Sequence, residues 1–197
     1  MLRLIIVRHG QTEANIQRRL QGQSDGPLTS VGLEQAEKLA LHLKDFHLDQ
    51  VLSSELIRSL DTAAAIAKYH HIPVKTSPLL KEWNCGELDG LPAEALAQAL
   101  KQANTSIATF RPTGGETLEE VQQRAAVFLN ELIASVQGQT VLVCSHGDFL
   151  RMLLSIILKK GIEEAETTIH FENASYSTYE YNNKEWKEIA FNQAALQ

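Results

Sequence analysis

The hydrophobic residues of this chain gather into short unbroken runs and into longer stretches with a regular spacing. The runs 4–7 and 141–143 contain only aliphatic residues, as is typical of strands buried on both faces of a parallel sheet. In other stretches an apolar residue recurs every three or four positions, which predicts amphipathic helices over about 30–46, 56–67, 118–132 and 150–158. Strands that alternate with helices predict an α/β fold with a mostly parallel sheet.

Shorter strands are indicated by weaker signals. Residues 50–53 and 73–76 are typical of brief strands between the predicted helices. Towards the end of the chain, aromatic and polar residues alternate over 175–191, around the turn-forming pair Asn182-Asn183. This pattern predicts a terminal hairpin.

Two of the predicted helices carry recognisable start signals. Ser53 or Ser54 could cap the helix that follows the strand 50–53, because a hydroxyl accepts a hydrogen bond from a free helical N–H group. Thr117 and Glu120 have the spacing of a capping box, which predicts a helix beginning directly after Thr117.

The length of 197 residues, with 44 % hydrophobic and 21 % charged residues, predicts one globular domain spanning residues 1–197. Within it, the region 79–115 is irregular and contains several glycines and prolines, apart from a weaker helical pattern over about 93–103. We expect this region to be an insertion over the active face.

The net charge of −6 argues against a surface for nucleic acid or for an anionic membrane, since either needs an excess of basic residues. No apolar run approaches the roughly 20 residues of a membrane span, and the first residues lack the pattern of a secretory signal peptide. Cys85 and Cys144 fit neither a CxxC motif nor a disulfide framework. We therefore expect a cytoplasmic protein that binds neither nucleic acid nor membrane.

Two histidines follow the two buried runs in the same way. Arg8, His9 and Gly10 come directly after the first run, and His146 and Gly147 come shortly after the second. In open α/β sheets, ligands bind just outside the carboxyl ends of the strands. We expect both histidines to lie there.

Arg8 makes phosphoryl chemistry the best interpretation of the first of these sites. An arginine in this position would leave an unpaired charge in the core unless a ligand met it. The guanidinium fork matches phosphate oxygens, and a neutral imidazole such as that of His9 is a good nucleophile. Gly10 lets the backbone approach a ligand closely.

At this point the sequence resembles a known family, the histidine phosphatase superfamily, also called the phosphoglycerate mutase-like family. Four signatures stand in the family's order and cover the chain from Leu2 to about Tyr181. They are Arg8-His9-Gly10-Gln11-Thr12 with Asn15, Gly22 and Pro27-Leu28-Thr29 behind it, Leu52-Ser53-Ser54-x-x-x-Arg58-x-x-x-Thr62, Glu82-x-x-x-Gly86-x-x-x-Gly90, and Ser145-His146-Gly147. The resemblance implies a three-layer sandwich, with helices on both sides of the sheet.

The resemblance also implies residue roles. His9 would be the nucleophile that forms a phosphohistidine, and Glu82 would protonate the leaving oxygen and then activate water. Arg8, Arg58 and His146 would stabilise the transition state. The phosphate-binding set would comprise Arg8, Asn15, Gln21, Gly22, Arg58, His146 and Gly147. No metal or cofactor is implied, because arginine and histidine supply the charge.

Glu87 and Asp89 share the loop of Glu82 and are alternative acids. Asp148 is unexpected, because a carboxylate beside a phosphate site opposes the dianion unless it points away or binds a donor of the substrate.

Within the family, the nearest alternative is a phosphoglycerate mutase, which transfers a phosphoryl group between hydroxyls. Such mutases carry a longer insertion with an adjacent arginine pair, whereas this chain has only Lys101, Arg111 and Arg124 as cations between Glu82 and His146. The chain is more similar to the broad-specificity and α-ribazole phosphatases, and fructose-2,6-bisphosphatase-like members are also candidates. Its partner would be a small-molecule phosphate ester, and a monomer and a homodimer are both compatible with the sequence.

Two other functions use the same residues differently. A binding module for phosphorylated ligands would lack one of the reacting groups, yet all are present here. A two-histidine phosphodiesterase acting on RNA ends would need two His-x-Thr/Ser elements, which His9-Gly10-Gln11 and His146-Gly147-Asp148 do not supply.

Overall fold

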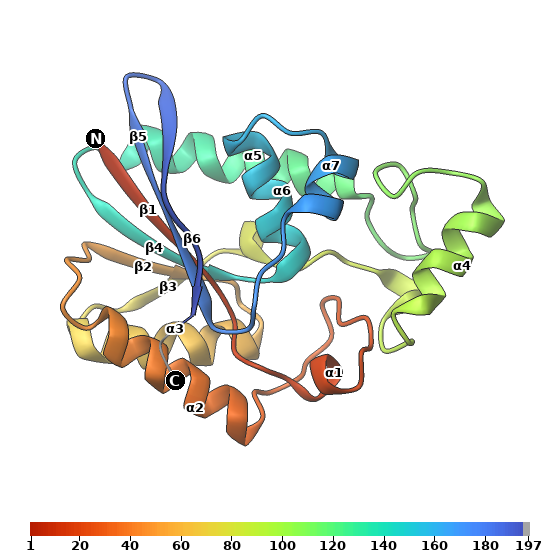
Figure 1. The fold of residues 1–197 in the computed structure, drawn as a ribbon, viewed down its shortest axis with the longest axis horizontal. Helices are drawn as coiled ribbons and strands as arrows, with labels where there is room; N and C mark the ends of the chain where they lie inside the picture. Colours follow the sequence, from red (N-terminus) through yellow and green to blue (C-terminus); the bar gives the residue numbers. More distant parts are fainter. Residues whose placement is uncertain (195–197) are drawn as a thin grey trace.

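The computed structural model describes residues 1–194, and its centre is one six-stranded sheet of order β3-β2-β4-β1-β5-β6 (Figure 1). The strands are β1 (Leu2–Arg8), β2 (Gln50–Ser53), β3 (Val74–Thr76), β4 (Thr140–Ser145), β5 (Ser175–Asn182) and β6 (Glu185–Ala194). β1 to β4 run parallel to one another, β5 pairs with β1 in antiparallel direction, and β6 pairs with β5 in antiparallel direction at the edge of the sheet. The predicted, mostly parallel sheet is confirmed.

Helices cover both faces of this sheet. They are α1 (Glu13–Ile16), α2 (Ser30–Leu43), α3 (Ile57–His70), α4 (Glu94–Ala103), α5 (Leu118–Ser135), α6 (Gly147–Ile157) and α7 (Ile162–Thr168), with short 3-10 turns η1 (Pro78–Leu80) and η2 (Gly86–Leu88). α2 and α3 lie on one face, α5, α6 and α7 lie on the other, and α4 projects beyond the sheet (Figure 1). Among residues 1–194, no helix has both the length and the apolar character that crossing a membrane requires.

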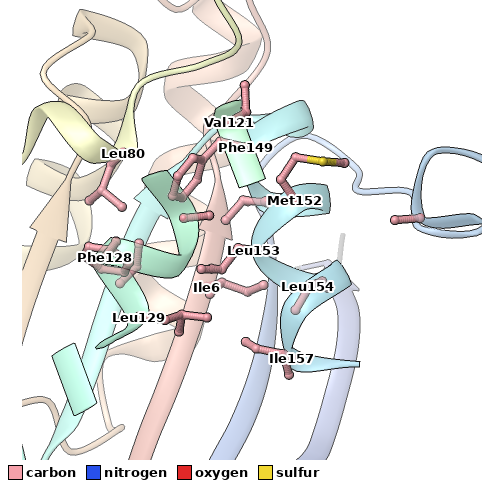
Figure 2. Close-up of a cluster of buried hydrophobic side chains, with 14 of the residues drawn as sticks. Ile6, Leu80, Val121, Phe128, Leu129, Phe149, Met152, Leu153, Leu154 and Ile157 are labelled. Atoms are coloured by element: carbon pink, nitrogen blue, oxygen red, sulfur yellow. The ribbon is translucent and has the colours of Figure 1, made fainter. Parts of the chain in front are cut away.

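The central strand β1 shows why the sheet is covered on both sides. Leu4 and Ile6 belong to the apolar cluster under α5 and α6, whereas Ile5 and Val7 belong to the cluster under α2 and α3. Figure 2 shows Ile6 among side chains of α5 and α6. All four side chains are fully buried, and each such burial contributes roughly 1.5–3 kcal/mol to stability. Successive side chains of a strand point to opposite faces, so an unbroken apolar run needs two covers.

The register of β1 and β4 brings the two histidines together. Arg8 pairs with Ser145 at the ends of these parallel strands, and the N–H of His9 donates to the carbonyl oxygen of Ser145 at 3.1 Å. The next residue of each chain segment is therefore a histidine, and both side chains leave the sheet at the same edge.

Local details differ from the sequence prediction where tertiary contacts decide them. Neither Ser53 nor Ser54 caps α3, whose N-cap is Leu56 without a side-chain bond; Ser54 instead accepts from the N–H of Leu56 at 3.2 Å. The hairpin turns at Asn183-Lys184, one residue later than predicted, where both residues adopt positive φ. Thr117 and Glu120 form the predicted capping box.

α1 and α7 were not predicted. α1 is a single turn held by its own capping box, in which Thr12 and Asn15 bond to each other's backbone. α7 is seven residues long and buries only Ile162 and Ala165. Elements this short contain too few turns for an apolar period to show in the sequence.

Candidate active site

A cleft of about 360 Å³ opens where β1 and β4 end. Its walls come from the end of β1 and the loop after it, from the loop of Glu82 and Trp83, and from α4, α6 and α7. The residues that line it are Arg8, His9, Asn15, Arg19, Leu20, Gln21, Glu82, Trp83, Ala93, Leu96, Ile107, Leu118, Gly147, Asp148, Arg151 and Glu166. A larger hollow of about 580 Å³, between α2 and residues 172–174, contains no histidine or arginine. We therefore place the candidate site in the first cleft.

His9 is held in the tautomer of a nucleophile. The side chain is buried, and its Nδ1 lies 2.7 Å from the carbonyl oxygen of Gly10. Because a carbonyl oxygen can only accept, Nδ1 carries the proton and Nε2 keeps a free lone pair. Burial, followed by the charges of Arg58 and Arg8, holds the pKa of His9 well below its usual value. The ring is neutral at physiological pH.

His146 lies beside it, with ring centroids 5.1 Å apart. It is fully buried and is the N-cap of α6, so the amino-terminal end of that helix faces the same place. Neither of its ring nitrogens has a hydrogen-bond partner among residues 1–194. Burial, followed by the charge of Arg58, lowers the pKa of His146 well below its usual value.

Two guanidinium groups lie near the histidines and lower their pKa values. Arg8 lines the cleft, whereas Arg58, like His146, is fully buried and is not among the residues that line it. Arg58 donates to the carbonyl oxygens of Gly22 at 2.6 Å and Ser24 at 3.0 Å. Arg8 donates to the carbonyl oxygen of Phe171 at 2.5 Å. The Nε atom of each arginine is buried and has no partner within the described residues. Buried polar atoms are nearly always hydrogen-bonded, so these donors indicate the place of an anionic ligand.

Glu82, the predicted acid, is one of the carboxylates that line the cleft. Its Oε1 accepts from the backbone N–H groups of Trp83 at 2.9 Å and Phe149 at 3.0 Å. Its Oε2 accepts from the backbone N–H of Asp148 at 3.3 Å. Burial, and next the charge of Asp148, raise the pKa of Glu82 to about 7. A Cβ built on Gly147 would lie 3.8 Å from both Glu82 Oε2 and Arg8 Nε, so the acid and the arginine flank residue 147.

The alternative acids have other contacts. Glu87 accepts from the hydroxyl of Thr113, and Asp89 accepts from the N–H groups of Gly22 and Ser24. Neither carboxylate lines the cleft. Both hold the loops together, and Glu82 is the carboxylate of this loop that lines the cleft with His9.

Of the other predicted phosphate-binding residues, Asn15 and Gln21 line the cleft. Asn15 Oδ1 accepts from Asn173 at 3.0 Å, and Gln21 Oε1 accepts from the hydroxyl of Thr12 at 2.7 Å. Gly22 is not among the lining residues; its carbonyl oxygen accepts from Arg58. A Cβ on Gly22 would lie 2.7 Å from the sulfur of Cys85, so this glycine allows its loop to pack closely against the loop of Cys85.

Sequence reasoning missed the clamp that holds Glu82. Arg124, on α5, donates to the carbonyl oxygens of Leu79 at 2.8 Å, Lys81 at 2.5 Å and Glu82 at 3.0 Å. It also binds both carboxylate oxygens of Glu116, at 3.1 and 3.0 Å. Glu116 in turn accepts from the N–H of Asn84 and, through its own carbonyl, from the indole of Trp83. The partners are mainly backbone groups, which leave no signature in a sequence.

Asp148, which the sequence leaves unexplained, forms an ion pair with Arg151 one helical turn later on α6. Arg151 also contacts Glu166 of α7 at 3.4 Å. The pair neutralises much of the charge that would oppose a phosphate. No cluster of three or more histidine, cysteine, aspartate or glutamate side chains in residues 1–194 is arranged to hold a metal ion.

This chain is similar to known proteins over nearly its whole length. The chain is 36 % identical over 191 residues to a Proteus mirabilis protein named "Probable phosphoglycerate mutase GpmB", covering 94 % of this chain and 88 % of that one. It is 28 % identical to the α-ribazole phosphatase from Shigella flexneri, with a TM-score of 0.89 over 99 % of this chain and 98 % of the other. A mycobacterial glucosyl-3-phosphoglycerate phosphatase in complex with VO3 gives 29 % identity and a TM-score of 0.87, over 98 % and 99 % of the two chains.

The family model of the histidine phosphatase superfamily, branch 1, matches residues 4–194. This range includes all four signatures and every residue of the site described above. The predicted phosphoglycerate mutase-like fold is thereby confirmed. The chain belongs to the histidine phosphatase superfamily.

Proposed function

We propose that this protein is a metal-independent phosphomonoester hydrolase that acts on a small phosphorylated metabolite through a phosphohistidine at His9. One observation carries the proposal. The neutral ring of His9, with its Nε2 lone pair free, is surrounded by buried donors of Arg8, Arg58 and His146 that have no partner among the described residues. Such an arrangement suits an anion that reacts with an imidazole.

In the first step, Nε2 of His9 attacks phosphorus on the side opposite the ester oxygen. The bond between phosphorus and that oxygen breaks, and the departing oxygen takes the proton of Glu82. The charge that spreads over the three phosphoryl oxygens is met by the two guanidinium groups and by His146.

In the second step, the carboxylate of Glu82 takes a proton from water while the water oxygen forms a bond to phosphorus. The bond between phosphorus and Nε2 breaks, its electron pair returns to the imidazole, and inorganic phosphate leaves. A pKa of about 7 suits both duties of Glu82, since its two protonation states are then close in free energy near neutral pH.

The distribution of cations favours a phosphatase over a mutase. Arg111 contacts the carbonyl of Gly115 and the carboxylate of Glu120, and Arg124 lies behind Glu82. Neither of them, nor Lys101, lines the cleft. The region 79–115, which we propose to be the insertion, thus brings no cation to a substrate carboxylate. A cytoplasmic location is part of the proposal, supported by the free, buried cysteines Cys85 and Cys144.

The test is phosphate release, with a chelator present, from p-nitrophenyl phosphate, 3-phosphoglycerate, a sugar bisphosphate and α-ribazole phosphate. We expect hydrolysis of at least one ester by the wild type and none by His9→Ala. Hydrolysis that requires a metal ion, or that survives in His9→Ala, contradicts the mechanism. Binding of inorganic phosphate without any turnover would identify a binding module instead, and movement of the phosphoryl group to a second hydroxyl would identify a mutase.

A further inference from the structure

We propose that the leaving-group side of the cleft selects neutral alcohols, and that the cluster Asp148–Arg151–Glu166 discriminates against leaving groups that carry a carboxylate or a second phosphate. This inference rests on the proposed phosphatase reaction and narrows its substrate class. It concerns the part of the cleft beyond Glu82, where the alcohol portion of an ester would lie.

The cluster borders the reacting groups directly. Asp148 follows Gly147, and its N–H donates to Glu82 at 3.3 Å. All three members of the cluster line the same cleft as His9. Arg151 Nε donates to the carbonyl of Ile169 at 3.1 Å, two residues before the carbonyl that holds Arg8. A substituent on the leaving group would therefore meet these charges.

Within the cluster, negative charge exceeds positive charge. The single guanidinium of Arg151 contacts both carboxylates through Nη1. Glu166 Oε1 is buried and has no hydrogen-bond partner among residues 1–194. Burial, and next the charge of Asp148, raise the pKa of Glu166 to about 7. Above this pH two carboxylates oppose one guanidinium, and an anionic substituent would have to compete with both for Arg151.

The remaining cations of the cleft have other partners. Arg19 donates to the side chain of Gln17 at 2.9 Å and to the carbonyl of Gly90 at 2.7 Å, at an exposed position. Arg8 belongs to the phosphoryl end. Among the described lining residues, no further lysine or arginine is present to receive a carboxylate.

The other lining residues of the cleft include an apolar set. It consists of Leu20, Trp83, Ala93, Leu96, Ile107 and Leu118. This set favours a leaving group with apolar or ring surface, because burying such surface contributes about 25 cal/mol per Å². A charged group placed there would lose hydration without gaining a partner.

Two esters of the same shape test the inference, 4-carbamoylphenyl phosphate and 4-carboxyphenyl phosphate, compared at pH 8. We expect the wild type to have a kcat/KM about 10- to 100-fold higher for the neutral carbamoyl ester, because like charges in a recognition site are strongly disfavoured. In Glu166→Gln and in Asp148→Asn this ratio should fall towards one. Glu163→Gln is the control variant. It changes an exposed carboxylate of α7, the helix that carries Glu166, and should leave the ratio as in the wild type.

Equal kcat/KM values for the two esters in the wild type, or a preference for the carboxylate, would overturn the selectivity. So would a wild-type ratio that persists in both cluster variants. These outcomes leave the phosphatase reaction intact, since both esters are still hydrolysed. The absence of hydrolysis of either ester by the wild type would instead refute the proposed function on which the inference rests.

Discussion

The two strand–histidine–glycine segments of this protein begin alike and end differently. His9 and His146 both follow buried parallel strands, and both are neutral because burial lowers their pKa. After His9 the chain turns away from the sheet, and the N–H of Gly10 donates to the hydroxyl of Thr62 at 3.1 Å. After His146 the chain enters α6 at once, and Leu150 donates back to the carbonyl of His146 at 2.9 Å.

The different continuations give the two imidazoles different capacities. In the first segment the carbonyl of Gly10 is free to accept from Nδ1 of its own neighbour, which fixes the tautomer and exposes Nε2 as a nucleophile. In the second, the ring of His146 has no protein partner among residues 1–194, so its N–H can donate to a ligand oxygen. A histidine and a glycine after a buried strand can thus supply a nucleophile or a stabilising donor, depending on the backbone that follows.

The largest effects on activity are expected when each of the two histidines is replaced in turn. His9→Ala should lower kcat by about 10⁴-fold or more, because the bond to phosphorus cannot form. His146→Ala should lower kcat by about 10²–10³-fold, because it removes one transition-state donor. Rapid quenching under alkaline, denaturing conditions, followed by peptide mass spectrometry, should find phosphate on His9 in the wild type and in His146→Ala.

His47→Ala is the matched control, since His47 is exposed and far along the chain from both strands. Its kcat should equal that of the wild type. Phosphate on His146, or full activity of His9→Ala, would reverse the two roles.

An effect smaller than that of His9→Ala is expected from Glu82→Gln, which tests the segment of His146, because α6 supplies two of the N–H groups that hold this carboxylate. The first step needs the protonated acid. With a pKa of about 7 for Glu82, wild-type kcat/KM for an alkyl phosphate should therefore be highest below pH 7 and fall as pH rises through it.

In Glu82→Gln, kcat/KM, which reports only the first step, should fall by about 10³-fold with alkyl phosphates, and this alkaline limb should disappear. With p-nitrophenyl phosphate the loss should be about tenfold or less, since this leaving group departs without a proton. An equal loss with both kinds of ester would exclude Glu82 as the acid.

The smallest expected effect is that of Arg124→Met, which removes the clamp behind Glu82 and leaves both histidines unchanged. Displacing the acid by about 1 Å should lower kcat/KM for alkyl phosphates by about 10- to 100-fold. The loss of kcat/KM with p-nitrophenyl phosphate should again be smaller. The pH at which kcat/KM for alkyl phosphates falls should also change, because the pKa of Glu82 depends on the groups around it. Arg111→Met is the control, because Arg111 is more exposed and contacts Glu120 and Gly115. A purely structural role of Arg124 would lower the rates for both kinds of ester equally.

Most of the framework of the site could be predicted from the sequence. The apolar runs indicated β1 and β4, and the rule that ligands bind at the carboxyl ends of strands placed His9 and His146 at one edge. The choice of Glu82 over Glu87 and Asp89 depended on the resemblance to a family, because three carboxylates in one loop are equivalent in sequence. Their different contacts arise only when that loop packs against α5 and α6.

By itself, the sequence determined which segments become strands and helices, and which reactive side chains follow them. The physical reason is that apolar periodicity reports burial locally, one element at a time. Only the tertiary structure decided the chemistry of those side chains: the lowered pKa of His9, the raised pKa of Glu82, the pairing of Asp148 with Arg151, and the clamp of Arg124. These properties depend on desolvation and on charges brought from distant parts of the chain, which exist only after the elements have packed.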